Sequence, residues 1–237
     1  MIINVHAGHN PDGKAACGAV GLIRESTEAR RLKDEVITQL RQLGHIVYDC
    51  TVNNGTGQKD VLQKIVKMCN NHKADLDVSI HFNCAANDKH GNGKTTGTEV
   101  LLYSNASRAY DYAQNVCKAI SALGFKNRGI KYNPSLYVLK HTTAPAMLVE
   151  VCFVDDKDDV ELYACKAVAE AIVYGITGQY VQEVPETDKA EENEETAVGT
   201  KEPLYKTVTA TFRNRAYAEK EKERLLKAGF DCVITQV

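Results

Sequence analysis

Histidine and glutamate side chains stand at or near the ends of three predicted strands. The first strand runs into His6 and His9, a later strand ends on His81, and the last central strand carries Glu150. Two histidines and one carboxylate are a common ligand set for catalytic zinc, which keeps its fourth position for water. A further carboxylate beside the ion can take the proton of that water. These residue types favour water activation at a metal ion, although no H-E-x-x-H motif is present.

The carboxylate of such a ligand set has two candidates at the start of the first predicted helix. Glu25 and Glu28 both follow the segment Leu22–Arg24, between the first strand and that helix. The carboxyl ends of strands in an open α/β sheet meet at one edge, where ligands bind. Residue types and spacing alone leave the choice between the two glutamates open.

The elements that must position these residues alternate along the chain. Apolar runs and helical periodicity predict strands at 1–6, 45–48, 76–81, 98–102, 136–139 and 146–153, and helices at 27–43, 58–72, 106–123 and 155–176. Strands that alternate with helices of this length are typical of an α/β fold with a mostly parallel, twisted sheet and helices on both faces.

Composition and charge exclude several classes of protein. The 237 residues carry 29 basic and 31 acidic side chains, a net charge of −2, which argues against a nucleic-acid-binding chain. No apolar run approaches the roughly 18 residues that a membrane span needs. The N-terminus shows no basic segment followed by an apolar stretch. We therefore expect synthesis in the cytoplasm without a signal peptide and no partnership with a membrane or nucleic acid.

The composition divides the chain into three parts. Residues 1–180 form the α/β body and residues 181–203 an acidic linker, which carries eight acidic and two basic side chains within 183–202. A segment with so little to bury is expected to be flexible. Residues 204–237 read as strand, helix and strand, which predicts a small βαβ module.

Four short motifs occur in an order that resembles a known enzyme family. They are Ala-Gly-His9, Glu25 before the first helix, Ser-Ile-His81-Phe-Asn83 and Leu-Val-Glu150-Val-Cys-Phe. Together they resemble the zinc-dependent N-acetylmuramoyl-L-alanine amidases of the amidase_3 family, in particular the clostridial bacteriophage endolysins, over about residues 1–178. The resemblance implies a Zn²⁺ cofactor and hydrolysis of the amide between N-acetylmuramic acid and the first L-alanine of the peptidoglycan stem peptide.

The resemblance also implies roles for individual residues. His9, Glu25 and His81 match the zinc ligands of the family, and Glu150 matches its catalytic glutamate. Glu25 is preferred to Glu28 because the positions four and seven residues after Glu25 are apolar, as expected for the buried face of the family's first helix. The positions three and seven residues after Glu28 carry charged side chains instead.

Further side chains are candidates for contact with the substrate. Asn83 matches the family's asparagine two residues after the zinc histidine, and His141 follows a predicted strand, so both are expected to bind substrate. His6 is expected to be a packed neighbour of the site. Arg128 and Lys131 are expected on a solvated face, with stem-peptide carboxylates or an anionic wall polymer as the alternative partners.

The C-terminal module resembles half of a SPOR domain, a small module that binds peptidoglycan. A unit of about 35 residues rarely buries a sufficient core alone. We therefore expect peptidoglycan binding, pairing of two modules into a homodimer, or docking on the catalytic domain. The leading expectation is an endolysin that reaches the cell wall after holin-dependent release. A bacterial autolysin of the same activity and a non-catalytic wall-binding protein are the alternatives.

Overall fold

The computed structural model describes residues 1–181 and Lys222. Apart from Val181 and Lys222, the predicted linker at 181–203 and the predicted module at 204–237 lie outside these residues. In the part of the chain that is described, no helix is both long and apolar enough to cross a membrane.

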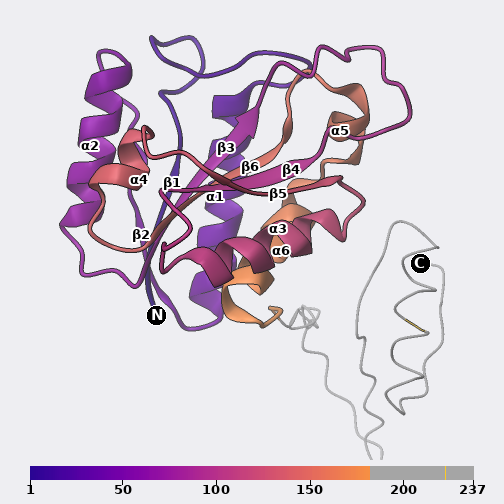
Figure 1. Ribbon diagram of the computed structural model, residues 1–237. Coiled ribbons are helices and arrows are strands. Elements are labelled where there is room, and N and C mark those ends of the chain that lie inside the picture. The colour runs from indigo at the N-terminus through magenta and orange to yellow at the C-terminus, as the bar shows by residue number, and fades with distance from the viewer. Residues whose placement is uncertain (182–221, 223–237) are drawn as a thin grey trace, which may run out of the picture. The chain divides into compact units, whose positions relative to one another are not determined.

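Six strands form one sheet in the order β2-β1-β3-β6-β4-β5 (Figure 1). The strands are β1 (Ile2–Ala7), β2 (Ile46–Asp49), β3 (Leu76–Asn83), β4 (Thr98–Leu102), β5 (Asn127–Tyr132) and β6 (Ala146–Phe153). All neighbouring strands are parallel except β4 and β6, which pair antiparallel. The predicted α/β fold with a mostly parallel sheet is therefore confirmed. The reversal at β4 also brings the amino ends of β4 and β5 to the edge where β3 and β6 end.

Helices cover both faces of the sheet, as predicted. They are α1 (Glu25–Gln42), α2 (Gln58–Asn70), α3 (Tyr110–Ser121), α4 (Tyr137–His141), α5 (Lys157–Leu162) and α6 (Cys165–Thr177). Helices α1, α3 and α6 pack on one face around the larger core. Helices α2 and α4 pack together over a smaller core on the other face.

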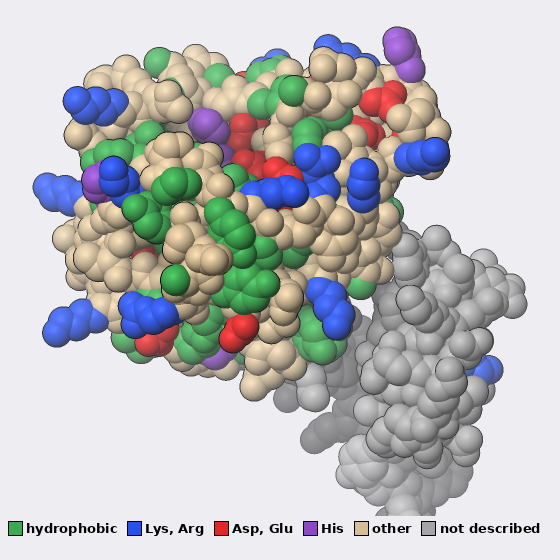
Figure 2. Space-filling model, in the orientation of Figure 1, with side chains coloured by type: hydrophobic (Ala, Val, Ile, Leu, Met, Phe, Trp, Pro, Cys, Tyr) green, Lys and Arg blue, Asp and Glu red, His purple; other side chains and the backbone are tan. Residues whose placement is uncertain are grey.

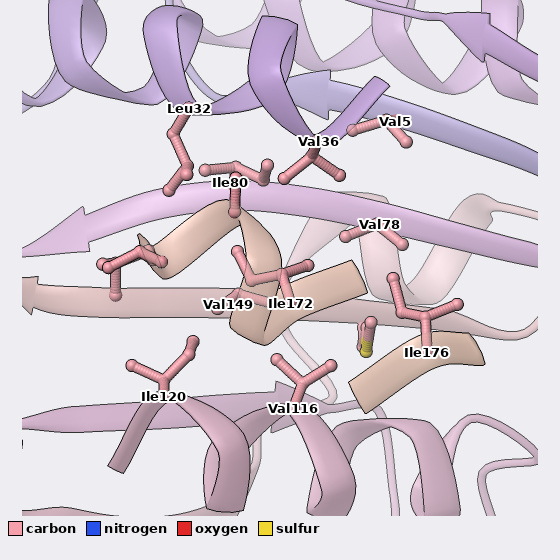
Figure 3. Close-up of a cluster of buried hydrophobic side chains, with 14 of the residues drawn as sticks. Val5, Leu32, Val36, Val78, Ile80, Val116, Ile120, Val149, Ile172 and Ile176 are labelled. Atoms are coloured by element: carbon pink, nitrogen blue, oxygen red, sulfur yellow. The ribbon is translucent and has the colours of Figure 1, made fainter. Parts of the chain in front are cut away.

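In the central strands, apolar side chains at every second position face the larger core. Side chains such as Ile80 and Val149 point from β3 and β6 toward α1, α3 and α6, where Leu32, Val116 and Ile172 meet them (Figure 3). Successive side chains of a strand point to opposite faces. The residues between these apolar positions therefore face α2 and α4, and this is the face that carries the polar and ionisable side chains.

One predicted strand is wrong, and one strand of the sheet was not predicted. The run 136–139, predicted as a strand, begins the short helix α4, because a run of four apolar residues cannot distinguish a strand from a buried helical turn. Val138 and Leu139 are buried against α2. Strand β5 was not predicted, since its sequence, Asn-Arg-Gly-Ile-Lys-Tyr, has no alternating apolar pattern at its half-exposed edge position.

The predicted helix at 155–176 is two helices. Tyr163 and Ala164 have extended backbones between α5 and α6, with ψ of 119° and 113°. The break lets the ring of Tyr163 pack edge-on against Phe82, with centroids 5.1 Å apart. The side chain of Asp156 accepts a hydrogen bond from the Asp159 amide and so caps α5.

A buried polar network lies on the α2 face of the sheet, away from the ends of the strands. The Asn4 amide donates hydrogen bonds to Asp77 Oδ1 at 2.6 Å and to the Cys69 carbonyl at 3.0 Å. Asp77 Oδ2 is buried and has no hydrogen-bond partner among the described residues. Burial outweighs the hydrogen bond from Asn4 and raises the pKa of Asp77 to about 6.

Replacing Asp77 with asparagine is expected to stabilise the fold at pH 7 by about 1–3 kcal/mol. The folded state holds the Asp77 proton up to about pH 6, whereas an unfolded aspartate releases it near pH 3.9. Between these values the folded state binds more protons, so wild-type stability falls as pH rises, and the cost persists above pH 6. Denaturant unfolding of wild type and Asp77→Asn from pH 4 to 7 measures the difference.

Asp75 supplies the control for this measurement, because it is exposed and directly precedes β3, the strand that carries Asp77. The variant Asp75→Asn should keep the wild-type loss of stability between pH 4 and 6. If Asp77→Asn keeps that loss as well, another group is responsible for it.

Candidate metal centre and active site

Three residues from separate segments converge at the edge where β1 and β3 end. His9 follows β1, Glu25 opens α1, and His81 lies near the end of β3. Glu25 Oε1 is 3.0 Å from His81 Nδ1 and 3.3 Å from His9 Nε2. The two imidazole rings meet edge-on with centroids 4.9 Å apart. The structure thus brings together the three residues that the sequence nominates as metal ligands, with ligand atoms within 4.8 Å of one another.

Two glycines make this approach possible. A Cβ atom on Gly8 would lie 2.0 Å from the His81 ring, and one on Gly18 would lie 2.5 Å from Glu25 Oε2. His9 itself has a φ of 62°, in the left-handed region that most side chains avoid. The glycine before His9 is therefore a steric requirement of the site, because any side chain there would displace His81.

Glu25 is held as a carboxylate. Its side chain is buried and accepts hydrogen bonds from the backbone amides of Ala19 at 2.8 Å and Phe82 at 3.2 Å. Burial alone would raise its pKa, but hydrogen bonds with His81 and His9 outweigh burial and hold the pKa well below its usual range. A buried carboxylate between two imidazoles is a ready acceptor for a cation.

Glu28, the other candidate carboxylate, has a different environment. It lies one turn further along α1 and pairs with Arg31 at 2.9 Å. It is not part of the cluster of possible ligands.

The chemistry of this donor set fits zinc. Zinc takes imidazole nitrogen and carboxylate oxygen at about 2.0–2.2 Å. Glu25 Oε1 lies 3.0 and 3.3 Å from the two imidazole nitrogens, and all the ligand atoms lie within 4.8 Å of one another, so small side-chain movements would let them hold one ion. Three protein ligands leave a fourth position for water or substrate, which is the arrangement of a catalytic rather than a structural site.

Glu150 lies beside this donor set. It is the direct register partner of His81 across the β3–β6 ladder. Its Oε2 is buried and has no hydrogen-bond partner among the described residues. Burial and the negative charges of Glu25 and Glu99 raise its pKa to about 8. A divalent cation at the neighbouring donor set would lower that pKa and favour the carboxylate.

The row of functional side chains continues across the sheet beyond Glu150. Glu99 of β4 is the register partner of Glu150 and is itself buried. Its two oxygens accept hydrogen bonds from Asn83 Nδ2 at 3.1 Å and from Arg128 Nε at 2.7 Å. In Figure 2, histidine and acidic side chains gather near the top of the view, with lysine or arginine side chains beside them.

His141 and His6, the two other histidines with predicted positions near the site, lie outside the donor set. His141 ends α4, where its ring packs on Tyr137 with centroids 4.2 Å apart, and its carbonyl accepts a hydrogen bond from Asn70. Its predicted contact with substrate stays a prediction. His6 is buried behind the site, and burial together with repulsion from His81 lowers its pKa to about 3. It is a neutral neighbour of the centre.

Helix α2 provides an apolar wall next to His9 and His81. A small hollow at the centre is lined by His6, Gly8, His9, Ala16, Gln58, Val61, Leu62, Ile65, His81 and Val138. The apolar members from α2 and α4 place a low-dielectric surface beside the two imidazoles, which strengthens electrostatic interactions at the centre.

Sequence reasoning missed how the loop after β3 is held. The Asp155 carboxylate accepts hydrogen bonds from the backbone amides of Ala85, Ala86 and Asn87, at 2.9–3.1 Å. Asp155 is the first residue of the helix predicted at 155–176, but α5 begins at Lys157. The loop next to the centre is therefore anchored from the segment that follows β6.

The far end of the same loop has a similar anchor. Asp159 is buried and accepts hydrogen bonds from the amides of Gly97 at 3.0 Å and Phe153 at 2.8 Å. Asp156 accepts a hydrogen bond from the Thr96 amide at 3.1 Å. The cluster of aspartates after β6 was the sequence signal that could have predicted these anchors. Carboxylates close to a glycine-containing loop can accept hydrogen bonds from backbone amides that have no other partner.

Comparison with known sequences gives a consistent set of relatives. A sequence model of the N-acetylmuramoyl-L-alanine amidase family matches residues 3–178. An uncharacterised protein of Clostridium perfringens (strain 13 / Type A) is 36% identical over 180 residues, 73% of this chain and 51% of that protein. The endolysin of Bacillus phage SPP1 is 30% identical over 174 residues, 68% of this chain and 58% of the endolysin. The chain spans about half the length of the curated relatives it matches.

Solved structures share the fold of the same region. The catalytic domain of an endolysin targeting Clostridia Difficile matches with a TM-score of 0.68 and 26% identity, over 77% of this chain and 99% of that domain. The amidase AmiC2 of Nostoc punctiforme matches with a TM-score of 0.61 and 26% identity, over 74% of this chain and 94% of that one.

Proposed function

Because the chain belongs to the N-acetylmuramoyl-L-alanine amidase family, we propose that it cleaves the amide between N-acetylmuramic acid and L-alanine in peptidoglycan, with zinc held by His9, Glu25 and His81. The observation that carries this proposal is the position of Glu150. Glu150 is the register partner of His81, which belongs to the donor set, and Glu150 Oε2 has no hydrogen-bond partner among the described residues. A protein that only bound the cell wall would have no need for this arrangement.

The protein groups around the reacting amide have distinct tasks. When bound, zinc supplies Lewis-acid polarisation of the scissile carbonyl and acidifies a water molecule. Glu150 takes the proton of the attacking water and then delivers a proton to the nitrogen of L-alanine as that amine leaves. Glu25 contributes negative charge to the ligand set, and its two backbone donors fix its orientation.

Asn83, near the row formed by His81, Glu150 and Glu99 across the sheet, is proposed to bind substrate. Its amide nitrogen donates to Glu99, and its Oδ1 accepts from the Cys84 amide, so its side chain has a defined orientation. His141 is proposed as a more distant contact with substrate from the end of α4.

The biological role that we propose is that of an endolysin. The likenesses to the phage endolysin and to the endolysin catalytic domain support it. A bacterial autolysin of the same activity is the alternative, since Bacillus amidases are also among the relatives. For residues 204–237, peptidoglycan binding or pairing of two chains remains our proposal from the sequence pattern.

Digestion of purified cell walls tests the proposed activity. Wild-type protein is expected to release new N-terminal alanine without new reducing sugar ends. A chelator should abolish the release, and zinc should restore it where magnesium does not, because the donor set is nitrogen-rich. Release of reducing ends, or full activity in a protein shown to contain no metal, would disprove the proposed chemistry.

A further inference from the structure

Arg128 is a cationic side chain held by contacts near the candidate site, and the proposed chemistry does not use it. Its Nε donates to Glu99 Oε2 at 2.7 Å, and its guanidinium lies over the ring of Phe153, 4.9 Å from the centroid. One hydrogen bond and one aromatic contact hold the guanidinium in place. Within the described residues, its terminal amino groups have no hydrogen-bond partner in the protein. Arginine carries five N–H donors, so most of its donors remain for a ligand.

The position of Arg128 follows from the reversal of β4 and β5. Because β5 runs antiparallel to β6, the start of β5 lies at the edge where β3 and β6 end. Neighbouring strands are about 4.8 Å apart. The guanidinium contacts Glu99 of β4 and Phe153 of β6, which are the register partners of Glu150 and Asn83. Glu99 lies two strands from His81, about 10 Å across the sheet, and an extended peptide covers that distance in about three residues.

The chemistry of the substrate decides what this group can bind. In a muramoyl-peptide the lactyl carboxyl is consumed in the amide that is cleaved. Any free carboxylate of this unit is therefore on the peptide that departs with the amine. Two terminal N–H groups in one plane match a carboxylate in a bidentate pair. Since Glu99 balances the charge of Arg128, directed hydrogen bonds rather than net charge would provide the recognition.

We propose that Arg128 is a specificity-determining residue that binds a carboxylate of the stem peptide on the leaving side of the scissile amide. The proposal rests on the proposed amidase function and adds a substrate class to it: acidic stems are preferred to stems whose carboxylates are amidated. Glu99 and Phe153 are positioning residues, because they act on the substrate through the orientation of Arg128.

A pair of soluble N-acetylmuramoyl-peptides tests this recognition. The two compounds are identical except that the stem carboxylates of one are free and those of the other are amidated, and neither carries phosphate. Wild type is expected to favour the free-carboxylate compound about 10- to 100-fold in kcat/KM. The variant Arg128→Gln should lose that preference, mostly through KM, while its rate on the amidated compound changes less than about threefold. Arg128→Lys should recover only part of the preference for the free-carboxylate compound. Lysine keeps a positive charge, but its ammonium cannot make the bidentate pair.

A second cation on the same strand provides the matched control. Lys131 is exposed and lies further from the site edge, where it pairs with Leu101. Lys131→Gln should behave as wild type on both compounds. Equal losses for Arg128→Gln on both compounds would show that Arg128 only supports the fold. A loss that appears solely on walls that carry phosphate polymers would assign Arg128 to that polymer, and either result overturns the proposal.

Equilibrium binding separates this proposal from the proposed function. Calorimetry with the released stem peptide and its amidated form requires no turnover. If wild type cleaves neither compound yet binds the acidic peptide at least about tenfold more tightly, and Arg128→Gln does not, the recognition stands and the amidase function fails. If wild type cleaves both compounds equally and binds both peptides equally, the function stands and the recognition is wrong.

Discussion

Replacing Glu150 with glutamine is expected to lower kcat on cell walls by about 10²- to 10⁴-fold, the range of a lost general acid–base group. Glutamine keeps the volume of the side chain but cannot take a proton from water. The affinity for zinc should remain near that of wild type, because Glu150 is outside the cluster of possible ligands. Rates of alanine release and metal content, measured on the same preparations, check both statements.

The folded state of this variant should be intact. In the metal-free protein the pKa of Glu150 is raised to about 8 by burial and by Glu25 and Glu99. Its folded pKa thus exceeds the unfolded value of about 4.3, and wild-type stability falls as pH rises between the two. Glu150→Gln removes that fall and should be at least as stable as wild type at pH 8.

An exposed carboxylate provides the control for the Glu150 experiment. Glu161 pairs loosely with Lys157 at 3.6 Å, and 66% of its side chain is exposed. Glu161→Gln should keep wild-type activity. If Glu150→Gln retains more than about a tenth of wild-type kcat, Glu150 is not the proton-transfer group.

Replacing Glu25 with glutamine is expected to weaken zinc binding by more than about 100-fold. Loss of a group that merely supports a ligand costs about 10- to 100-fold, and Glu25 is proposed as a ligand itself. The neutral amide removes the negative charge between His9 and His81. Competition with a chromophoric chelator measures the affinity, and hydrolysis should fall in parallel at limiting zinc.

Glu28→Gln is the matched control for Glu25, since it alters a carboxylate three residues away on the same helix. Its present partner is Arg31 on the surface of α1. This variant should hold zinc as wild type does. The opposite outcome, in which Glu28→Gln loses the metal and Glu25→Gln keeps it, would transfer the ligand role to Glu28.

The parallel strands β1, β2, β3 and β6 were predictable, because their apolar runs indicate strands and the candidate site residues follow or end these strands. Strand ends bearing His9, His81 and Glu150 had to meet at one edge once the strands were parallel. The same rule cannot find Glu99 or Arg128. Both lie at the amino ends of strands that run the other way, and the reversal leaves no mark in the local sequence.

Other errors have a common origin in tertiary packing. The apolar run 136–139 becomes a helix because α2 offers it a surface to pack on. Asp155 looks like a helix-terminal acid, but its carboxylate is engaged by amides 68 to 70 residues earlier in the chain. Such long-range partners are set by the assembled fold, which periodicity over one segment does not report.

The anchoring of the loop after β3 by the aspartates after β6 has a consequence for protein engineering. Asp155 and Asp159 supply acceptors for both ends of that loop. A chimaera that imported the loop alone from a relative would leave backbone amides or carboxylates buried without partners, at about 1–3 kcal/mol each. The loop and the segment 155–159 therefore form a single graft, and exchange of the two together is the way to vary this border of the active site while keeping the sheet.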